Sequence, residues 1–223
     1  MNLKLKNSAR VRLVLAAAAL SLFAGAVNPI ASREGKLGNF QGHTDIGATP
    51  KSGTASYNGS RREYTIIGGG ANMWGAQDAF HFVWRRASGD ISLAASVSLQ
   101  GSGGNEHRKA GLMIRQGLGA GDAYADAIIH GDGLTSLQYW ENSGAETREV
   151  RASANAPQFI RLERHGNTFT LFTADAQQRF TKAGSATVEL RDPVYVGLAV
   201  CSHDASALQT AIFRHVKFSG KSR

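Results

Sequence analysis

The residues best suited to chemistry in this chain are polar side chains that alternate with apolar ones along short segments. Arginine, histidine and glutamine are frequent in runs such as RKAGLMIRQ and QFIRLERHGNTFTLF. The arginine fork matches a carboxylate with two parallel hydrogen bonds, so this set suits the binding of a polar polymer or an acidic sugar. The candidate ligand-binding residues are His81, Arg115, His130, Gln138, Trp140, Arg161 and His203.

Tryptophan supplies the second kind of candidate contact, because an indole can stack on the face of a sugar ring. Trp140 ends a predicted strand on its polar side and is the proposed platform, with plain packing as the alternative. Trp74 follows a glycine loop, and exposure is expected there too. Trp84 shares its strand face with Phe80 and Phe82, which predicts a place in the core.

Metal binding is a weaker hypothesis than ligand binding. His81, His130 and His203 are predicted to share the polar face, and three imidazoles can bind zinc. They lie on separate strands without a local spacing signature, so no metal is assigned. A structural Ca²⁺ is left open at acids of turns and strand ends, which more often cap backbone amides. Those acids are Asp45, Asp90, Asp132, Asp192 and Asp204.

The carboxylates argue against catalysis, although the enzyme question stays open. Glycoside hydrolysis uses two carboxylates about 5–9.5 Å apart, which acids two residues apart on one strand would supply. Glu146 and Glu149 are three residues apart, so on a strand they face opposite sides. Glu163 lies near Arg161 and Arg164, which favours an ion pair. No serine elbow, zinc-protease or phosphate-loop motif occurs.

Short strands must position these residues, because the alternation has the two-residue period of a half-buried strand. Glycine and asparagine turns separate the runs, and no window keeps a helical period for three turns. The predicted strands span Thr54–Tyr57, Glu63–Gly68, Asp78–Arg85, Gly89–Gln100, Lys109–Gln116, Tyr124–Ile129, Thr135–Tyr139, Glu146–Val150, Gln158–Arg164, Thr168–Ala174, Ser185–Val188, Val194–Cys201 and Gln209–Phe218. Many short strands at this spacing predict an all-β, two-sheet antiparallel sandwich.

The alternation also assigns strand faces. Leu112, Leu162 and Leu198 fall on the side that should be buried between the sheets, whereas His81 and Val83 fall on the polar side. On that polar side, small residues of one strand lie beside long polar residues of its neighbours. Such a surface forms a groove that holds an extended ligand.

The first 26 residues are predicted to be a cleaved signal peptide. A basic start precedes an apolar stretch from Val11 to Val27, and Ala24-Gly25-Ala26 has the small-x-small pattern of a cleavage site. The apolar run is short against the roughly 20 residues that span a bilayer, so no transmembrane segment remains in the mature protein. We therefore expect an exported protein, periplasmic or extracellular.

The rest of the chain is expected to form one domain. Residues 27–38 are predicted to be a flexible leader, 39–220 the sandwich, and 221–223 a tail. Cys201 is the single cysteine, so no disulfide closes within the chain, and an apolar core must stabilise it. Within the apolar run around it, Cys201 is expected to be a packed strand residue.

The charge of the mature chain is modest. Four of the 25 basic side chains and none of the 17 acidic ones precede the cut, which leaves a net charge of +4 instead of +8. The charges are scattered and no reading motif is present, so nucleic-acid binding is not expected.

Several motifs together resemble a bacterial exported domain family of unclear function. They are His43–Gly47, Met73–Phe82, Ser88–Asp90, Lys109–Arg115, His130–Leu134 with Gln138-Tyr139, and Gly197–His203. The family is grouped with the concanavalin A-like lectin/glucanase jelly rolls, and some relatives carry a Tol biopolymer-transport label. The resemblance covers about Asn39 to Phe218 and implies a jelly-roll sandwich, but it transfers no catalytic residues. Trp140 stands where the family's Gln-Tyr-Arg run has arginine, which would alter what the groove prefers.

Together the residues and the resemblance predict a non-catalytic exported sandwich that binds a polysaccharide or another polar polymer in the groove of its concave sheet. An acidic polysaccharide is one candidate ligand. The first alternative is a cell-envelope protein-interaction module linked to a Tol-type system, with envelope proteins as partners. The second is a glycosidase or polysaccharide lyase with dispersed catalytic residues. No cofactor is predicted apart from the calcium left open above.

Overall fold

The computed structural model describes residues 37–222, and every structural statement below refers to them. The predicted signal peptide, residues 27–36 of the predicted leader and Arg223 lie outside this range. Within it, no helix combines the length and the hydropathy needed to cross a bilayer.

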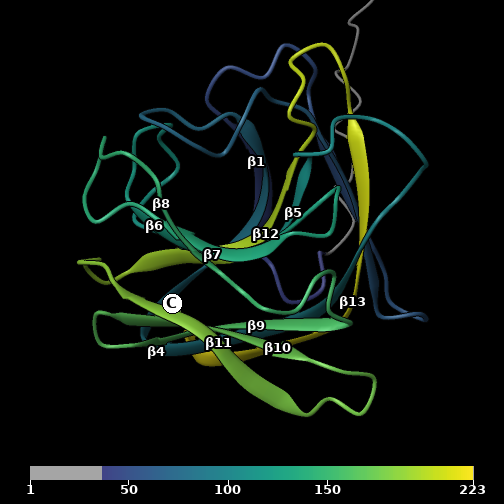
Figure 1. Cartoon of the computed structure of the whole chain (residues 1–223). Coiled ribbons are helices and arrows are strands. Elements are labelled where there is room, and N and C mark those ends of the chain that lie inside the picture. Colours follow the sequence, from purple (N-terminus) through teal and green to yellow (C-terminus); the bar gives the residue numbers. More distant parts are fainter. Residues whose placement is uncertain (1–36, 223) are drawn as a thin grey trace, which may run out of the picture. The chain divides into compact units, whose positions relative to one another are not determined.

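Thirteen antiparallel strands form the two layers of a jelly-roll sandwich (Figure 1). The strands are β1 Gly42–Ile46, β2 Thr54–Asn58, β3 Glu63–Gly68, β4 Phe80–Leu99, β5 Lys109–Arg115, β6 Tyr124–His130, β7 Thr135–Tyr139, β8 Arg148–Arg151, β9 Phe159–His165, β10 Thr168–Ala174, β11 Phe180–Thr187, β12 Val194–Cys201 and β13 Gln209–Ser222. The first layer runs β1-β4-β12-β5-β6-β7-β8, and the second runs β11-β10-β9-β4-β13-β3-β2. The predicted fold class is confirmed.

Strand β4 belongs to both layers. Its first part pairs with β1 and β12, and its second part pairs with β9 and β13. Between the two parts lies Gly89, whose φ of 74° is in the left-handed region that favours glycine. The prediction of two separate strands, Asp78–Arg85 and Gly89–Gln100, is therefore wrong about the break, since one 20-residue strand continues from layer to layer.

Most predicted strands are present with ends that differ by a few residues, but β1 was missed. Its sequence, GHTDI, has a single large apolar residue, Ile46, and so carries no apolar alternation. The strand forms because β4 offers it a partner, with Gly42 opposite Trp84 and Ile46 opposite Phe80.

Two apolar clusters hold the described chain together. The larger one fills the space between the layers and contains Leu112, Leu162 and Leu198, each fully buried as predicted. The second lies on the other side of the first layer, the hollow side of its curve in Figure 1, which we call the concave face. It consists of Ile46, Met73, Phe80, Phe82, Met113, Tyr124, Ile128, Trp140, Ala199 and Cys201.

The face assignment of β4 requires a correction. Phe80 and Phe82 point to the concave face, and Val83 points into the core between the layers. Both faces of this part of β4 are buried, so apolar side chains occur on both. Alternation therefore could not tell one face from the other.

Candidate functional site

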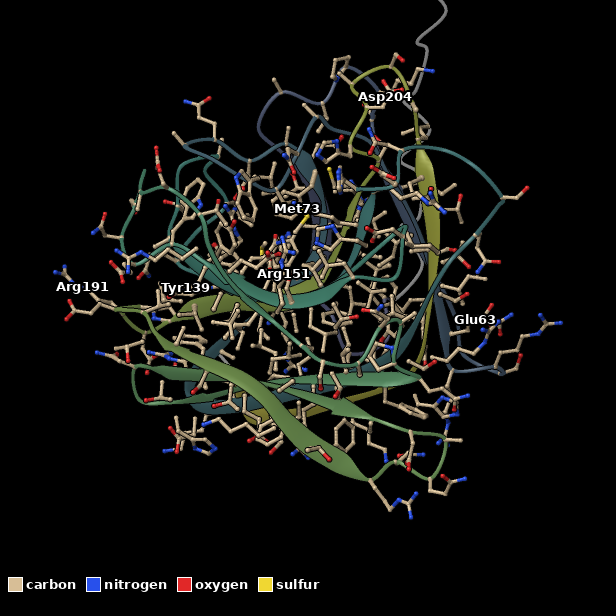
Figure 2. The ribbon with its side chains drawn as sticks, viewed as in Figure 1. Glu63, Met73, Tyr139, Arg151, Arg191 and Asp204 are labelled. Atoms are coloured by element: carbon tan, nitrogen blue, oxygen red, sulfur yellow. The ribbon has the colours of Figure 1, made fainter. Side chains whose placement is uncertain are left out.

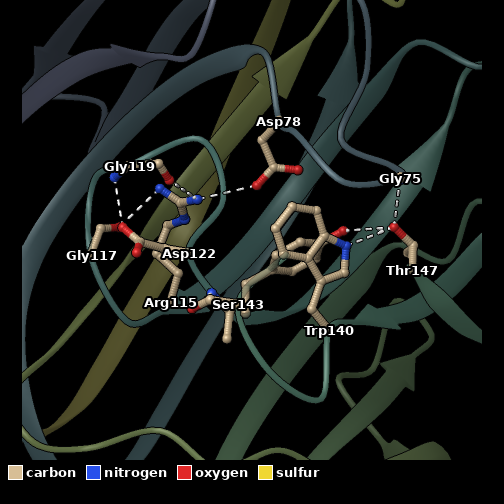
Figure 3. Close-up of polar contacts among 11 residues, drawn as sticks. Gly75, Asp78, Arg115, Gly117, Gly119, Asp122, Trp140, Ser143 and Thr147 are labelled. Atoms are coloured by element: carbon tan, nitrogen blue, oxygen red, sulfur yellow. Dashed lines mark hydrogen bonds and ion pairs between the residues drawn. The ribbon is translucent and has the colours of Figure 1, made fainter. Parts of the chain in front are cut away.

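A chain segment covers the concave face, which the sequence predicted to be an open groove. Residues 69–79 connect β3 to β4, and Met73 of this segment is fully buried in the second cluster. The backbone N–H of Gly75 donates to Thr147 Oγ1 at 2.8 Å, and Asp78 contacts Arg115 on β5 (Figure 3). We call residues 69–79 the cover segment.

Arg115 lies on the predicted face but is sealed beneath this cover. Its side chain is fully buried and donates to Asp78 Oδ2 at 3.1 Å and to the carbonyls of Gly117 and Gly119 at 2.9 Å each (Figure 3). Burial raises the pKa of Asp78 to about 7, although Arg115 and Lys109 lower it. The expectation of an accessible arginine is therefore wrong. Arg115 donates to acceptors in two loops, and the alternation of strand residues gives no information about loops.

Trp140 is buried as well, which corrects the expectation of an exposed platform. Its indole N–H donates to Thr147 Oγ1 at 2.8 Å, and its ring lies 5.0 Å from that of Tyr124 (Figure 3). Trp140 is therefore a packed residue, as the alternative stated. The Thr147 hydroxyl that accepts from its indole also accepts from Gly75, which joins Trp140 to the cover segment.

Two further candidates lie away from the concave face. His81 is 1% exposed, on the face of β4 opposite to Phe80, with its Nδ1 2.7 Å from Asp45 Oδ1 and its Nε2 3.0 Å from His43. Burial lowers the pKa of His81, and Asp45 counteracts that. Arg161 lies on the outer face of the second layer, because its neighbour Leu162 is in the core between the layers and successive strand residues face opposite sides.

The structure does bring His130, Gln138 and His203 together, at one end of the concave face. Here a cavity of about 240 Å³ opens to the surface, and we call it the Trp74 cavity. It is lined by Asn72, Trp74, His107, Lys109, His130, Leu134, Glu149, Arg151 and His203. Met73 and Arg151, both labelled in Figure 2, belong to this side of the first layer. Gln138 lies directly behind the wall.

Hydrogen bonding around Gln138 fixes the state of His130. The amide Nε2 of Gln138 lies 3.2 Å from Glu149 Oε1 and 3.1 Å from His130 Nε2. A carboxylate only accepts, so the amide nitrogen must donate, and His130 Nε2 accepts. The ring proton of His130 then sits on Nδ1, which is buried and has no hydrogen-bond partner among the described residues.

The electrostatics of the cavity favour neutral imidazoles beside one ionised carboxylate. Burial and the charge of Lys109 lower the pKa of His130 to about 4, and burial also lowers the pKa of His203. Burial raises the pKa of Glu149, but hydrogen bonds from Arg151, Gln138 and Ser136 outweigh it, so the pKa is lower than usual. At neutral pH the two imidazoles can both donate and accept hydrogen bonds.

Lys109 and Trp74 form the wall where the cover segment meets β5. The ammonium of Lys109 donates to Asn72 Oδ1 at 2.8 Å and to the Met73 carbonyl at 3.1 Å, and lies 5.4 Å from the Trp74 ring centroid. Trp74 is 40% exposed, as the sequence predicted. Its indole is therefore available to a ligand, whereas Lys109 is nearly buried.

The described residues contain no assembled set of metal ligands. His81 lies apart from His130 and His203, and no group of three histidine, cysteine or acidic side chains is placed to hold an ion in residues 37–222. Each of the five turn acids accepts a hydrogen bond from a backbone N–H. The pairs are Asp45 with Gly53, Asp90 with Gly166, Asp132 with Leu134, Asp192 with Gly89, and Asp204 with Ser206. The capping interpretation fits all five.

Besides Lys109, the candidate set from the sequence lacks five lining residues: Asn72, His107, Leu134, Glu149 and Arg151. Asn72 and His107 lie in loops, for which alternation gives no signal. Glu149 and Arg151 share one face of β8, two residues apart, and that spacing could have identified them together.

Comparisons with known proteins agree with the fold. No family model matches the chain, and no curated protein matches it significantly, so the resemblance to Tol-labelled relatives has no support. A functionally unknown protein from Saccharomyces cerevisiae has a similar structure, with a TM-score of 0.58 and 15% identity over 77% of this chain and 97% of that one.

Two further solved structures are similar. The carbohydrate-binding module CBM66 from Bacillus subtilis has a TM-score of 0.51 and 17% identity over 82% of this chain and 98% of that one. GH43B of the Bacteroides ovatus xyloglucan locus has a TM-score of 0.50 and 17% identity over 71% of this chain and 33% of that one. At such identities these likenesses establish a shared jelly-roll sandwich fold.

Proposed function

We propose that this protein binds a glycan and that the binding site is the Trp74 cavity. One observation carries the proposal: the cavity presents an exposed indole, Trp74, beside His130, whose buried Nδ1–H has no hydrogen-bond partner among the described residues. A buried donor without a partner costs about 1–3 kcal/mol, which an acceptor on a ligand would recover. The similarity to a carbohydrate-binding module supports the same class of ligand.

The chemistry of the wall suits sugar hydroxyls. A pyranose ring would stack on Trp74, and its hydroxyls would meet the neutral imidazoles of His130 and His203 and the Glu149–Arg151 pair. These groups offer both donors and acceptors, which a hydroxyl needs because it does both. The lining therefore favours a neutral sugar in this cavity.

Binding without bond cleavage is the role that the lining supports best. Among the described residues that line the cavity, Glu149 is the single carboxylate, and hydrolysis uses two. Arg151 holds Glu149 at 2.7 Å, and the low pKa of this carboxyl makes it a poor proton donor.

Titration calorimetry with neutral polysaccharides (β-glucan, xylan, mannan and starch) tests the proposal. At least one should bind, and Trp74→Ala should weaken that binding about tenfold through lost stacking. His203→Ala should weaken it too. Added salt should change the affinity little, because hydroxyl contacts carry no charge.

The matched control is Leu208→Ala, which removes the other large apolar side chain exposed in the described residues and does not line the cavity. It should leave the affinity unchanged. No binding of any polysaccharide, or equal losses in the Trp74 and Leu208 variants, would contradict the proposal.

A further inference from the structure

The outer face of the second layer contains a stripe of small residues. In the second part of β4, Ile91, Leu93 and Ala95 point into the core between the layers, so the residues between them point outward. Those outward residues are Ser92, Ala94, Ser96 and Ser98. The stripe forms a shallow floor between the longer side chains of β9 and β13.

One wall of this trough is an arginine held by aromatic rings. Arg161 on β9 is directly opposite Ala94, and its guanidinium carbon lies 4.3 Å from the Phe172 ring centroid and 4.4 Å from that of Phe180. Such stacking fixes a guanidinium by its faces and leaves its N–H groups, which lie in its plane, directed elsewhere. The side chain is therefore held in place before any ligand arrives.

The donors of Arg161 are incompletely used. Its Nε lies 3.0 Å from Glu163 Oε1, but the two are not aligned for a hydrogen bond. Neither terminal nitrogen donates a hydrogen bond to a described residue, and 27% of the side chain is exposed. A planar anion could therefore accept two parallel bonds from this edge of the guanidinium.

The opposite wall, on β13, is also basic and aromatic. Lys217 is opposite Ala94 from the other side, so cations stand on both sides of the stripe. A cavity of about 230 Å³ lies between them, lined by Ser92, Ala94, Arg161, Phe180, Lys217, Phe218 and Ser219. Lys217 makes one long hydrogen bond, 3.3 Å to Gln178 Oε1.

From this geometry we propose a second binding site, in which the trough takes an acidic polysaccharide whose sugars carry carboxylates. A carboxylate pairs with the free edge of Arg161, and Lys217 faces it across the floor. The Phe180 ring contacts the apolar face of the sugar, and the small floor residues leave room for the chain. This site is separate from the Trp74 cavity and does not depend on it.

The test uses the full chain and two polymers that share one backbone. Polygalacturonate carries a carboxylate on every sugar, and its fully methyl-esterified form carries none. Polygalacturonate should bind, the ester should bind at least tenfold more weakly, and salt should weaken the binding of the acid. Arg161→Gln should lower the affinity for polygalacturonate at least tenfold, and Ser219→Leu, which narrows the trough without changing charge, should lower it as well.

Arg148→Gln is the matched control, because Arg148 is an exposed arginine paired with Glu141 on the first layer. It should keep the affinity for polygalacturonate, and circular dichroism should show all variants folded. Unchanged affinity in Arg161→Gln would overturn the proposal, as would equally tight binding of polyglutamate, which has the charge without the sugar ring. Because the Trp74 cavity is tested with neutral polymers, either site can fail without the other.

Discussion

Individual residues on the concave face combine charge with deep burial. Asp126 is fully buried beside Lys109, and burial raises its pKa well above the usual range, although Lys109 counteracts this. Asp78 of the cover segment and Arg115 of β5 form a fully buried ion pair. Two basic side chains anchor the cover segment to the sheet: Arg115 binds Asp78, and Lys109 donates to Asn72 and to the Met73 carbonyl.

The buried pair gives the first prediction. Arg115→Ala should lower the free energy of unfolding by about 3–5 kcal/mol, because it leaves Asp78 and two carbonyls without a donor. Arg148→Ala is the control: its pair with Glu141 is exposed and should contribute less than about 1 kcal/mol. Urea denaturation measures both. Similar small losses would show that the Arg115 pair does not hold the cover segment.

The imidazole of His130 gives a prediction in pH. Its pKa is about 4 when folded and near 6.5 when unfolded, so between these values the unfolded chain binds more protons. The contribution of neutral His130 to the free energy of unfolding is therefore fully present above pH 6.5 and is lost as the pH falls through 4. Relative to His130→Asn, the wild type should lose up to about 3 kcal/mol over that window.

Subtracting the two profiles isolates His130. The raised pKa of Asp78 acts in the opposite direction, since its protonation stabilises the fold as the pH falls from about 7, but it is present in both proteins. Urea titrations at several pH values provide the difference. A difference that stays constant from pH 7 to pH 4 would refute the assigned state of His130.

Among the elements, the cover segment explains why the sequence predicts the face on which a strand residue lies better than it predicts the solvent exposure of that residue. Alternation placed Arg115 and Gln138 on the concave side, where the structure has them. It could not reveal that residues 69–79 return across that side, because a loop contact between distant positions leaves no period in either segment. The same contact buries Trp140, for which the sequence predicts exposure. Trp74 lies on the cover segment itself and is exposed, as predicted.

Tight strand contact gives the element-scale prediction. Gly197 lies in β12 between β4 and β5, and a Cβ there would overlap the carbonyl oxygen of Val83. Gly197→Ala must therefore push the strands apart and should destabilise by at least about 2 kcal/mol. Gly121→Ala, where no atom lies within 4 Å of the added Cβ, should change stability by less than about 0.5 kcal/mol. Thermal unfolding of both variants decides the point.

Across the described molecule, strand β4 runs through both layers, and its side chains take part in both apolar clusters. One cluster lies between the layers and the other on the concave face, and β4 contributes to both. The sequence predicted the sandwich and the central leucines because burial between the sheets imposes a strict period. The shared strand escaped prediction because Ser88-Gly89-Asp90 reads as a turn, whereas β4 pairs with β13 both before this point, at Ala87 and Ser88, and after it, from Ser92 onward.

This continuity predicts that the layers unfold together. Trp84 and Trp140 pack in the concave cluster and Trp74 lies at its edge, so tryptophan fluorescence reports on the first layer alone, while circular dichroism reports on all strands. Phe169→Ala, in β10 of the second layer, should destabilise by about 3–5 kcal/mol. If the layers unfold together, the fluorescence and dichroism midpoints in urea should fall equally and coincide, as in a two-state transition. Thr168→Ala, at an exposed neighbouring position, should move neither midpoint. A dichroism midpoint that falls while the fluorescence midpoint stays would show that the layers unfold independently.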